Sequence, residues 1–169
     1  MNNEIIEGLA TDFRNAIDSA KATGIFVDDI VMNAFPKGCC GDVTDLLGEY
    51  LMEHGIEDLW YVSGTHYPST GDEEEDFYNI QTHAWLSIGN PLEPRSVYID
   101  ITCDQFKDKQ EYDYFDKRVY VGEKGEFHSL FRVKSPDYYP FSGLESYNGS
   151  KYRLLSLYKL IVNHLEQSI

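Results

Sequence analysis

Positive charge is scarce in this chain. Its 169 residues include 14 Lys and Arg against 29 Asp and Glu, which gives a formal net charge of −15 at pH 7. A surface with so few cations repels phosphate backbones and anionic lipid headgroups. The composition therefore disfavours nucleic acid and membrane surfaces as partners, and it is compatible with a basic protein or peptide.

Long apolar runs and a leader are also missing. No stretch is long and apolar enough to span a bilayer, and Met1–Glu4 has no basic segment followed by an apolar run, so we expect no signal peptide. The only cysteines are Cys39, Cys40 and Cys103, an odd number without the spacing of a disulfide framework. At least one free thiol is expected, and a reducing, cytoplasmic location is favoured.

Signatures of metal binding are absent as well. The chain contains no C-x-x-C pair and no H-E-x-x-H sequence, the spacings that most clearly predict zinc. The side chains weighed as ligands lack any recognisable zinc spacing; they are Cys39, Cys40, Cys103, His66 and His83. We therefore expect neither a metal nor another cofactor.

Hydrophobic periodicity predicts three helices. Apolar residues recur at helical spacing over residues 3–22, 40–54 and 150–167. Gly24 and Gly55 follow the first two segments and are typical helix-ending residues. The first and third segments lie at the two ends of the chain, and the second begins at Cys40.

Between the helices the sequence predicts an antiparallel sheet. Aromatic and β-branched residues, in places alternating with polar ones, predict strands at 59–63, 80–88, 97–101, 118–121 and 127–133. Residues 64–76, which include the acidic run Asp72–Asp76, are interpreted as a solvated loop, or alternatively as a flap that selects basic substrates. No repeat, low-complexity tract or linker interrupts the chain, which predicts one α+β domain over residues 1–169.

The segment Gly38-Cys39-Cys40-Gly41-Asp42 marks the start of the second predicted helix. A cysteine in the first helical turn lies at the positive end of the helix dipole, next to backbone N–H groups without helical partners. Both features favour the thiolate, which is the nucleophilic form of cysteine. The neighbouring glycines let other groups approach the sulfur closely.

Nucleophilic cysteine catalysis also needs an imidazole base and a group that orients it. His83 lies in the second predicted strand and Asp100 at the end of the third. If these strands are antiparallel neighbours, the two side chains share one face of the sheet. A catalytic triad further requires that the cysteine helix docks its N-terminus against that face.

Several short blocks resemble, in order, the transglutaminase-like superfamily of papain-like cysteine folds. They are Gly38–Asp42 (G-x-C-x-D/E), Gly55-Ile56, Val62-Ser63-Gly64, His83-Ala84-Trp85 (H-A-W) and Asp100-Ile101-Thr102 (D-P-T), which together cover about residues 36–106. Ile101 stands where the family has proline. The short spacing between His83 and Asp100 is similar to that of compact bacterial members.

The resemblance implies a papain/transglutaminase-like α+β fold in which the nucleophile helix packs on an antiparallel sheet, with flanking N- and C-terminal helices. It implies Cys40 as nucleophile, His83 as general base and acid, and Asp100 as the residue that orients His83. The G-x-C-x-D register favours Cys40 over Cys39 as the nucleophile. The family spans proteases, amidases, deamidases, cross-linking enzymes and inactive modules, so the reaction type does not carry over.

Two further residues are predicted near the site. Trp85 is expected in the core or as a wall beside the site. Gln105 is considered for the oxyanion hole, although papain-like enzymes take that amide from before the cysteine. The backbone N–H of Cys40 is the better oxyanion donor.

The sequence thus predicts thiol-dependent acyl chemistry on an amide of a protein or peptide. Hydrolysis is preferred to amine transfer, because water needs no second substrate pocket. The rival hypothesis is a non-catalytic acidic module of the interaction or immunity type that masks a basic partner.

Overall fold

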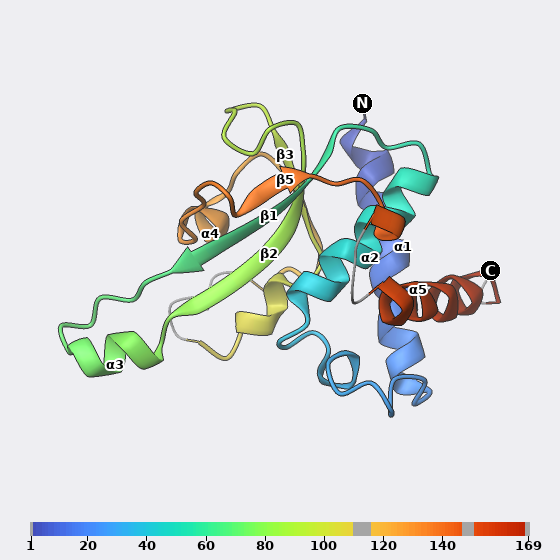
Figure 1. The fold of residues 1–169 in the computed structure, drawn as a ribbon, viewed down its shortest axis with the longest axis horizontal. Helices are drawn as coiled ribbons and strands as arrows, with labels where there is room; N and C mark the ends of the chain where they lie inside the picture. The colour runs from blue at the N-terminus through green and yellow to red at the C-terminus, as the bar shows by residue number, and fades with distance from the viewer. Residues whose placement is uncertain (1, 110–115, 147–150, 168–169) are drawn as a thin grey trace.

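The computed structural model describes residues 2–109, 116–146 and 151–167 (Figure 1). Its helices are α1 (Asn3–Ala22), α2 (Cys40–Glu53), α3 (Glu73–Tyr78), α4 (Glu126–Ser129) and α5 (Lys151–Glu166). Its strands are β1 (Leu59–His66), β2 (Gln81–Ile88), β3 (Val97–Asp100), β4 (Tyr120–Gly122) and β5 (Tyr138–Pro140). Short 3-10 turns lie at Met32–Ala34 (η1), Cys103–Phe106 (η2) and Leu144–Ser146 (η4).

Within the described residues, five strands form one antiparallel sheet in the order β4-β3-β2-β1-β5. Strands β1 and β2 pair along their whole length, from Leu59 with Ile88 to His66 with Gln81. This hairpin extends away from the helices and carries α3 at its tip (Figure 1). The class is therefore α+β, as the sequence predicts.

The two faces of the sheet belong to different hydrophobic clusters. Leu86 and Ile99, which are directly paired, pack with α1, α2 and α5 in the larger cluster. Their neighbours Trp85 and Tyr98 point the other way, into a smaller cluster that is rich in aromatic residues. Successive side chains of a strand alternate between faces, so one short stretch of sequence serves both clusters.

The three long helices match their predictions closely. The side chain of Asn2 caps α1 by accepting from the backbone N–H of Glu4 at 3.0 Å. Helix α2 ends at its C-cap His54, and Gly55 follows with a φ of 78°, a conformation that glycine adopts without strain. Helix α5 agrees with the predicted segment 150–167 over the described residues, since Ser150 lies outside them.

Most of the predicted strands are confirmed. Strands β2, β3 and β4 lie within two residues of the predicted segments 80–88, 97–101 and 118–121. Strand β1 contains the predicted segment 59–63 and continues to His66, so the start of the predicted loop is wrong. The hydrogen bonds of the long hairpin with β2 support these extra residues.

The acidic run is a helix rather than a loop. Asp72 caps α3 by accepting from the backbone N–H groups of Glu74 and Glu75, each at 3.0 Å. The carboxylates that follow lie in the first turn, where the helix dipole favours negative charge. The run is solvated, as expected, but the capping residue allows it to fold locally.

The prediction of a strand at 127–133 is wrong. Phe127, His128 and Phe131 are all buried, whereas Ser129 is exposed. A strand would place 127, 129 and 131 on one face and 128 on the other, whereas α4 and the turn that follows it bring the three buried residues to one side. The edge strand β5 forms instead in a segment interpreted as irregular, with Pro140 at the sheet margin, where its missing N–H costs no ladder bond.

Gly64 in β1 provides a test of how tightly the aromatic cluster is packed. A Cβ atom at this position would lie 2.7 Å from the Cβ of Phe131 and 3.0 Å from the ring of Trp85. We expect Gly64→Ala to lower the free energy of unfolding by about 1–3 kcal/mol, the usual cost of overpacking. Urea unfolding measures this change.

Gly8 in α1 is the matched control, because a Cβ atom there meets nothing within 4 Å. Gly8→Ala is expected to raise stability by about 1 kcal/mol through helix propensity. A Gly64→Ala protein as stable as wild type would contradict the packing described here.

Among the described residues, no helix combines the length and the apolar character that crossing a bilayer requires.

Candidate active site

Cys40 is the first residue of α2. Gly38 turns the chain just before it with a φ of 70°. The N-cap residue Cys39 makes no side-chain capping bond, so the first-turn N–H groups of the helix receive no cap from it. The apolar stripe of α2 is buried and packs against β1 and β2, which fixes the helix over the sheet; it comprises Val43, Leu46, Leu47, Tyr50 and Leu51.

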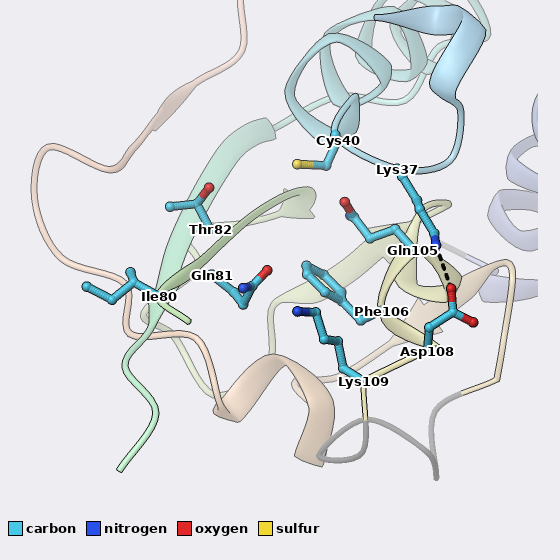
Figure 2. A pocket seen from close by; sticks show the side chains of 10 residues that line it. Lys37, Cys40, Ile80, Gln81, Thr82, Gln105, Phe106, Asp108 and Lys109 are labelled. Atoms are coloured by element: carbon cyan, nitrogen blue, oxygen red, sulfur yellow. Dashed lines mark hydrogen bonds and ion pairs between the residues drawn. The ribbon is translucent and has the colours of Figure 1, made fainter. Parts of the chain in front are cut away.

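The thiol of Cys40 opens into a pocket of about 400 Å³ (Figure 2). The lining residues come from the segment that leads into α2 and its first residue, from the start of β2, and from η2 and the residues after it. They are Lys37, Gly38, Cys40, Ile80, Gln81, Thr82, Gln105, Phe106, Asp108 and Lys109. Lys109 points into this pocket, and Lys37 pairs with Asp108 at 2.5 Å (Figure 2). None of the acidic residues 72–76 lines it.

His83 and Asp100 form a buried pair. Both side chains are fully or almost fully inaccessible, and His83 Nε2 lies 2.5 Å from Asp100 Oδ2. They come from β2 and β3, which are antiparallel neighbours, and share the face of the sheet opposite Leu86 and Ile99. The structure therefore brings the two residues together as the sequence predicts.

Asp100 accepts hydrogen bonds on both carboxylate oxygens. Oδ1 accepts from the backbone N–H of Thr102 at 2.9 Å and from its hydroxyl at 3.3 Å. Oδ2 accepts from His83 and also from Nε2 of His128 at 2.9 Å. Burial alone would raise the pKa of Asp100, but the two histidines outweigh burial and hold it well below its usual range.

The pKa values of Cys40 and His83 are shifted toward a thiolate–imidazolium pair. Burial would raise the pKa of Cys40, but the hydrogen bond and charge of His83, with the backbone N–H of Ala84, lower it overall. Burial would lower the pKa of His83, but the charge and hydrogen bond of Asp100, together with Cys40, raise it to about 9. At neutral pH these shifts favour a charged thiolate beside a charged imidazole.

The other two thiols have the opposite character. Cys39 is 1% exposed in the larger cluster, and burial raises its pKa to about 12. Cys103 is fully buried, and burial raises its pKa well above the ordinary value. Of the three cysteines, Cys40 is the one that lines the pocket and has a lowered pKa.

The negative charge of Asp42, in the first turn of α2, is neutralised by an element that the sequence did not connect to the site. Arg153 in α5 donates to Asp42 Oδ2 at 2.6 Å and also pairs with Asp29 at 2.8 Å. An unpaired carboxylate at this position would raise the pKa of Cys40. The ion pair with Arg153 offsets that effect.

Gln105 lies in the pocket, in contact with the histidine. Its amide nitrogen is 2.9 Å from Nδ1 of His83, and its amide oxygen points toward Cys40 (Figure 2). In the neutral imidazole, Nδ1 accepts from the amide N–H; after His83 takes a proton, Nδ1 donates, and the amide oxygen is the matching acceptor. The observed contact matches an Nδ1 that accepts, and Gln105 serves the protonated ring only after its amide group turns over.

Trp85 lies in the core, which is one of its two expected places, and it does not line the pocket as the alternative assignment to a wall required. It is 1% exposed and packs in the aromatic cluster beneath the site, with its ring centre 5.6 Å from that of His83. Two positions separate them on β2, which places both on the same face of the sheet. Trp85 thus supports the histidine from behind.

Sequence reasoning missed His128, for which no partner could be identified from the pattern. His128 contacts Asp100 and the aromatic cluster, whose residues come from distant parts of the chain. The available signal is the spacing of Phe127 and Phe131 around His128, but the composition of this segment predicts a strand. Potential metal ligands also meet here, since ligand atoms of His83, Asp100 and His128 lie within 4.8 Å of one another.

Comparison of the chain with protein-family models, with curated proteins and with solved structures found no match. The resemblance to the transglutaminase-like superfamily therefore stays a prediction from short motifs.

Proposed function

We propose that this protein is a cysteine hydrolase of the transglutaminase-like, papain-related type that cleaves an amide bond of a protein or peptide. One observation carries the proposal: the thiol of Cys40 lines a pocket and has a lowered pKa beside the buried His83–Asp100 pair. Strongly perturbed titratable groups in a pocket are typical of active sites.

The reaction begins with the Cys40 thiolate. Its sulfur attacks the amide carbonyl, a C–S bond forms, and negative charge develops on the carbonyl oxygen. The N–H groups at the start of α2, left without a side-chain cap, are suited to stabilise that oxyanion. Collapse of the intermediate breaks the C–N bond as Nδ1 of His83 gives its proton to the leaving amine.

Hydrolysis of the thioester completes the cycle. Neutral His83 takes a proton from water at Nδ1, and the hydroxide so formed attacks the thioester carbonyl. The C–S bond breaks, a carboxylic acid leaves, and the Cys40 thiolate and protonated His83 return. Asp100 keeps the proton of His83 on Nε2 throughout, so that Nδ1 always faces the reaction.

Alkylation with iodoacetamide tests this proposal without knowledge of the substrate. Because only the thiolate reacts, we expect Cys40 to be carboxamidomethylated with an apparent pKa below the ordinary value of about 8.5. Cys39 and Cys103 should stay unmodified in the folded protein, because both are buried and their pKa values are raised. Peptide mass mapping after timed quenching at several pH values locates and quantifies each product.

An inert Cys40, or one that titrates like a free thiol, would remove the support for catalysis and favour the acidic interaction module. If Cys40 is reactive, peptide amides with and without an added primary amine separate the two reactions. Product that forms only with the amine would identify amine transfer instead of hydrolysis.

A further inference from the structure

His128 is a buried histidine that directly contacts the orienting carboxylate. It lies in α4, is fully inaccessible to solvent, and places Nε2 2.9 Å from Asp100 Oδ2. The same oxygen accepts from His83 at 2.5 Å. The reaction proposed above assigns His128 no step, although a buried histidine is a costly residue to place without a role.

Aromatic rings hold His128 in place. Ring centres lie 4.9–5.3 Å from that of His128 and come from β2, β3, β4 and α4; they belong to Trp85, Tyr98, Tyr120 and Phe127. A ring packed in this way has little freedom to turn, so the direction of its Nε2–H bond is fixed by the core. That direction is toward Asp100.

Asp100 needs such a fixed donor. A buried carboxylate without water must have its charge satisfied by hydrogen bonds. His83 donates to Oδ2 from Nε2 throughout the proposed cycle, but its charge changes as Nδ1 loses and regains a proton; His128 is the second donor to that oxygen and takes no part in the proton transfer. Burial lowers the pKa of His128 despite the opposing effect of Asp100, which favours the neutral ring, and a neutral ring donates from Nε2 without adding a second positive charge.

We propose that His128 is a positioning residue, which holds the Asp100 carboxylate in the orientation that aligns His83 with Cys40. The inference rests on the proposed function, and it extends the catalytic arrangement to a fourth side chain. His128 lies outside the segment 36–106 that carries the family resemblance, so this device belongs to the C-terminal part of this chain.

Other titratable groups also lie around this cluster. They are the thiols of Cys40 and Cys103, the phenols of Tyr98 and Tyr120, the carboxyl of Asp104 and the ammonium of Lys124. Burial raises the pKa values of Cys103, Tyr98 and Tyr120 above their ordinary values, which favours the neutral forms of these three groups.

A pair of isosteric variants tests the inference. Glutamine can place an amide nitrogen near the position of Nε2 of histidine, whereas the amide of asparagine reaches only the position of Nδ1. We expect His128→Gln to keep the wild-type pH profile of Cys40 alkylation. His128→Asn should move its acid limb upward by about one pH unit or more, a tenfold loss of thiolate at fixed pH.

A purely structural role would affect both variants equally, and equal shifts would overturn the inference, as would two unshifted profiles. Tyr98→Phe is the packing control, since Tyr98 touches His128 but donates its hydroxyl to Pro91; its thermal stability should fall while its acid limb stays in place. A wild-type acid limb that moves on addition of EDTA would also overturn the inference, because the cluster would then hold a metal.

A measurement on the wild-type protein keeps the inference testable if the variants do not fold. In ¹⁵N-histidine spectra, neutral His128 should carry its proton on Nε2, and its pKa should lie below the ordinary histidine value. A proton on Nδ1 alone would overturn the inference. An ordinary Cys40 pKa in wild type would instead reject the proposed function itself, so the two failures are distinguishable.

Discussion

Replacement of His83 by alanine is expected to raise the apparent pKa of Cys40 from below to above the ordinary thiol value of about 8.5. In the wild-type protein, the hydrogen bond and charge of His83 outweigh the effect of burial on the thiol. Without the imidazole, burial remains and disfavours the thiolate. At pH 6.5 the rate of alkylation should therefore fall by about 100-fold or more, since two pKa units correspond to that change in thiolate fraction.

His54→Ala is the matched control for this experiment. His54 caps α2 at its far end, where its Nδ1 lies 2.7 Å from the backbone oxygen of Tyr50. It should lower stability slightly and leave the alkylation profile of Cys40 unchanged. Equal profiles for His83→Ala and wild type would show that no thiolate–imidazolium pair exists, and the proposed hydrolase would lose its chemical basis.

Replacement of Arg14 by methionine is expected to cause the largest loss of stability. Arg14 in α1 is 2% exposed and donates to both carboxylate oxygens of Asp104 at 2.8 Å, and to the backbone oxygen of Ile101 at 2.6 Å. Removing one partner leaves the nearly buried charge of Asp104 uncompensated. We expect a loss of about 3–5 kcal/mol in the free energy of unfolding, the usual cost of breaking a buried ion pair.

Urea unfolding measures this loss, and Lys37→Met provides the comparison. Lys37 pairs with Asp108 at 2.5 Å, but both side chains are more than half exposed, so no measurable change in stability is expected. The double variant Arg14→Met, Asp104→Leu should recover much of the loss, because it leaves no unpaired charge. An Arg14→Met protein as stable as wild type would show that this ion pair does not anchor α1 to η2.

The anchoring by Arg14 also bears on the site. Asp104 lies in η2 next to Gln105, and Ile101 lies shortly before that turn. Loss of the anchor should therefore weaken the contact between Gln105 and Nδ1 of His83 as well.

The local chemistry of the chain determined its elements. Helix α1 and helix α2 follow from uninterrupted apolar stripes with polar or glycine ends, which are local signals and can be read in one pass. Strands β2 and β3 follow from β-branched and aromatic residues on either side of a turn. Cys40, His83 and Asp100 could be named because their side chains have the chemistry of a thiol, a base and an orienting carboxylate, and because the short blocks that contain them resemble a known family in order.

Short elements were less predictable, because few residues specify them and packing decides. The segment around Phe127 is compatible with a strand by composition, and it becomes helical because the aromatic cluster accepts residues 127, 128 and 131 together. Strand β5 forms where it can pair with the edge of β1. The aromatic cluster that α4 packs into and the strand that β5 pairs with both include residues far from these elements in the sequence.

The tertiary structure alone decided how the site is completed. The contact of His128 with Asp100, the pairing of Arg153 with Asp42 and the place of Trp85 beneath His83 join residues that are far apart or on different elements. Such contacts arise when the sheet and helices pack, because a buried charge takes whichever donor the fold brings within hydrogen-bond distance. The sequence by itself therefore determined the residue types and the elements that carry Cys40, His83 and Asp100. The packing of β2, β3, α4 and α5 around Asp100 and Asp42 determined the hydrogen-bond partners and the orientation of these two carboxylates.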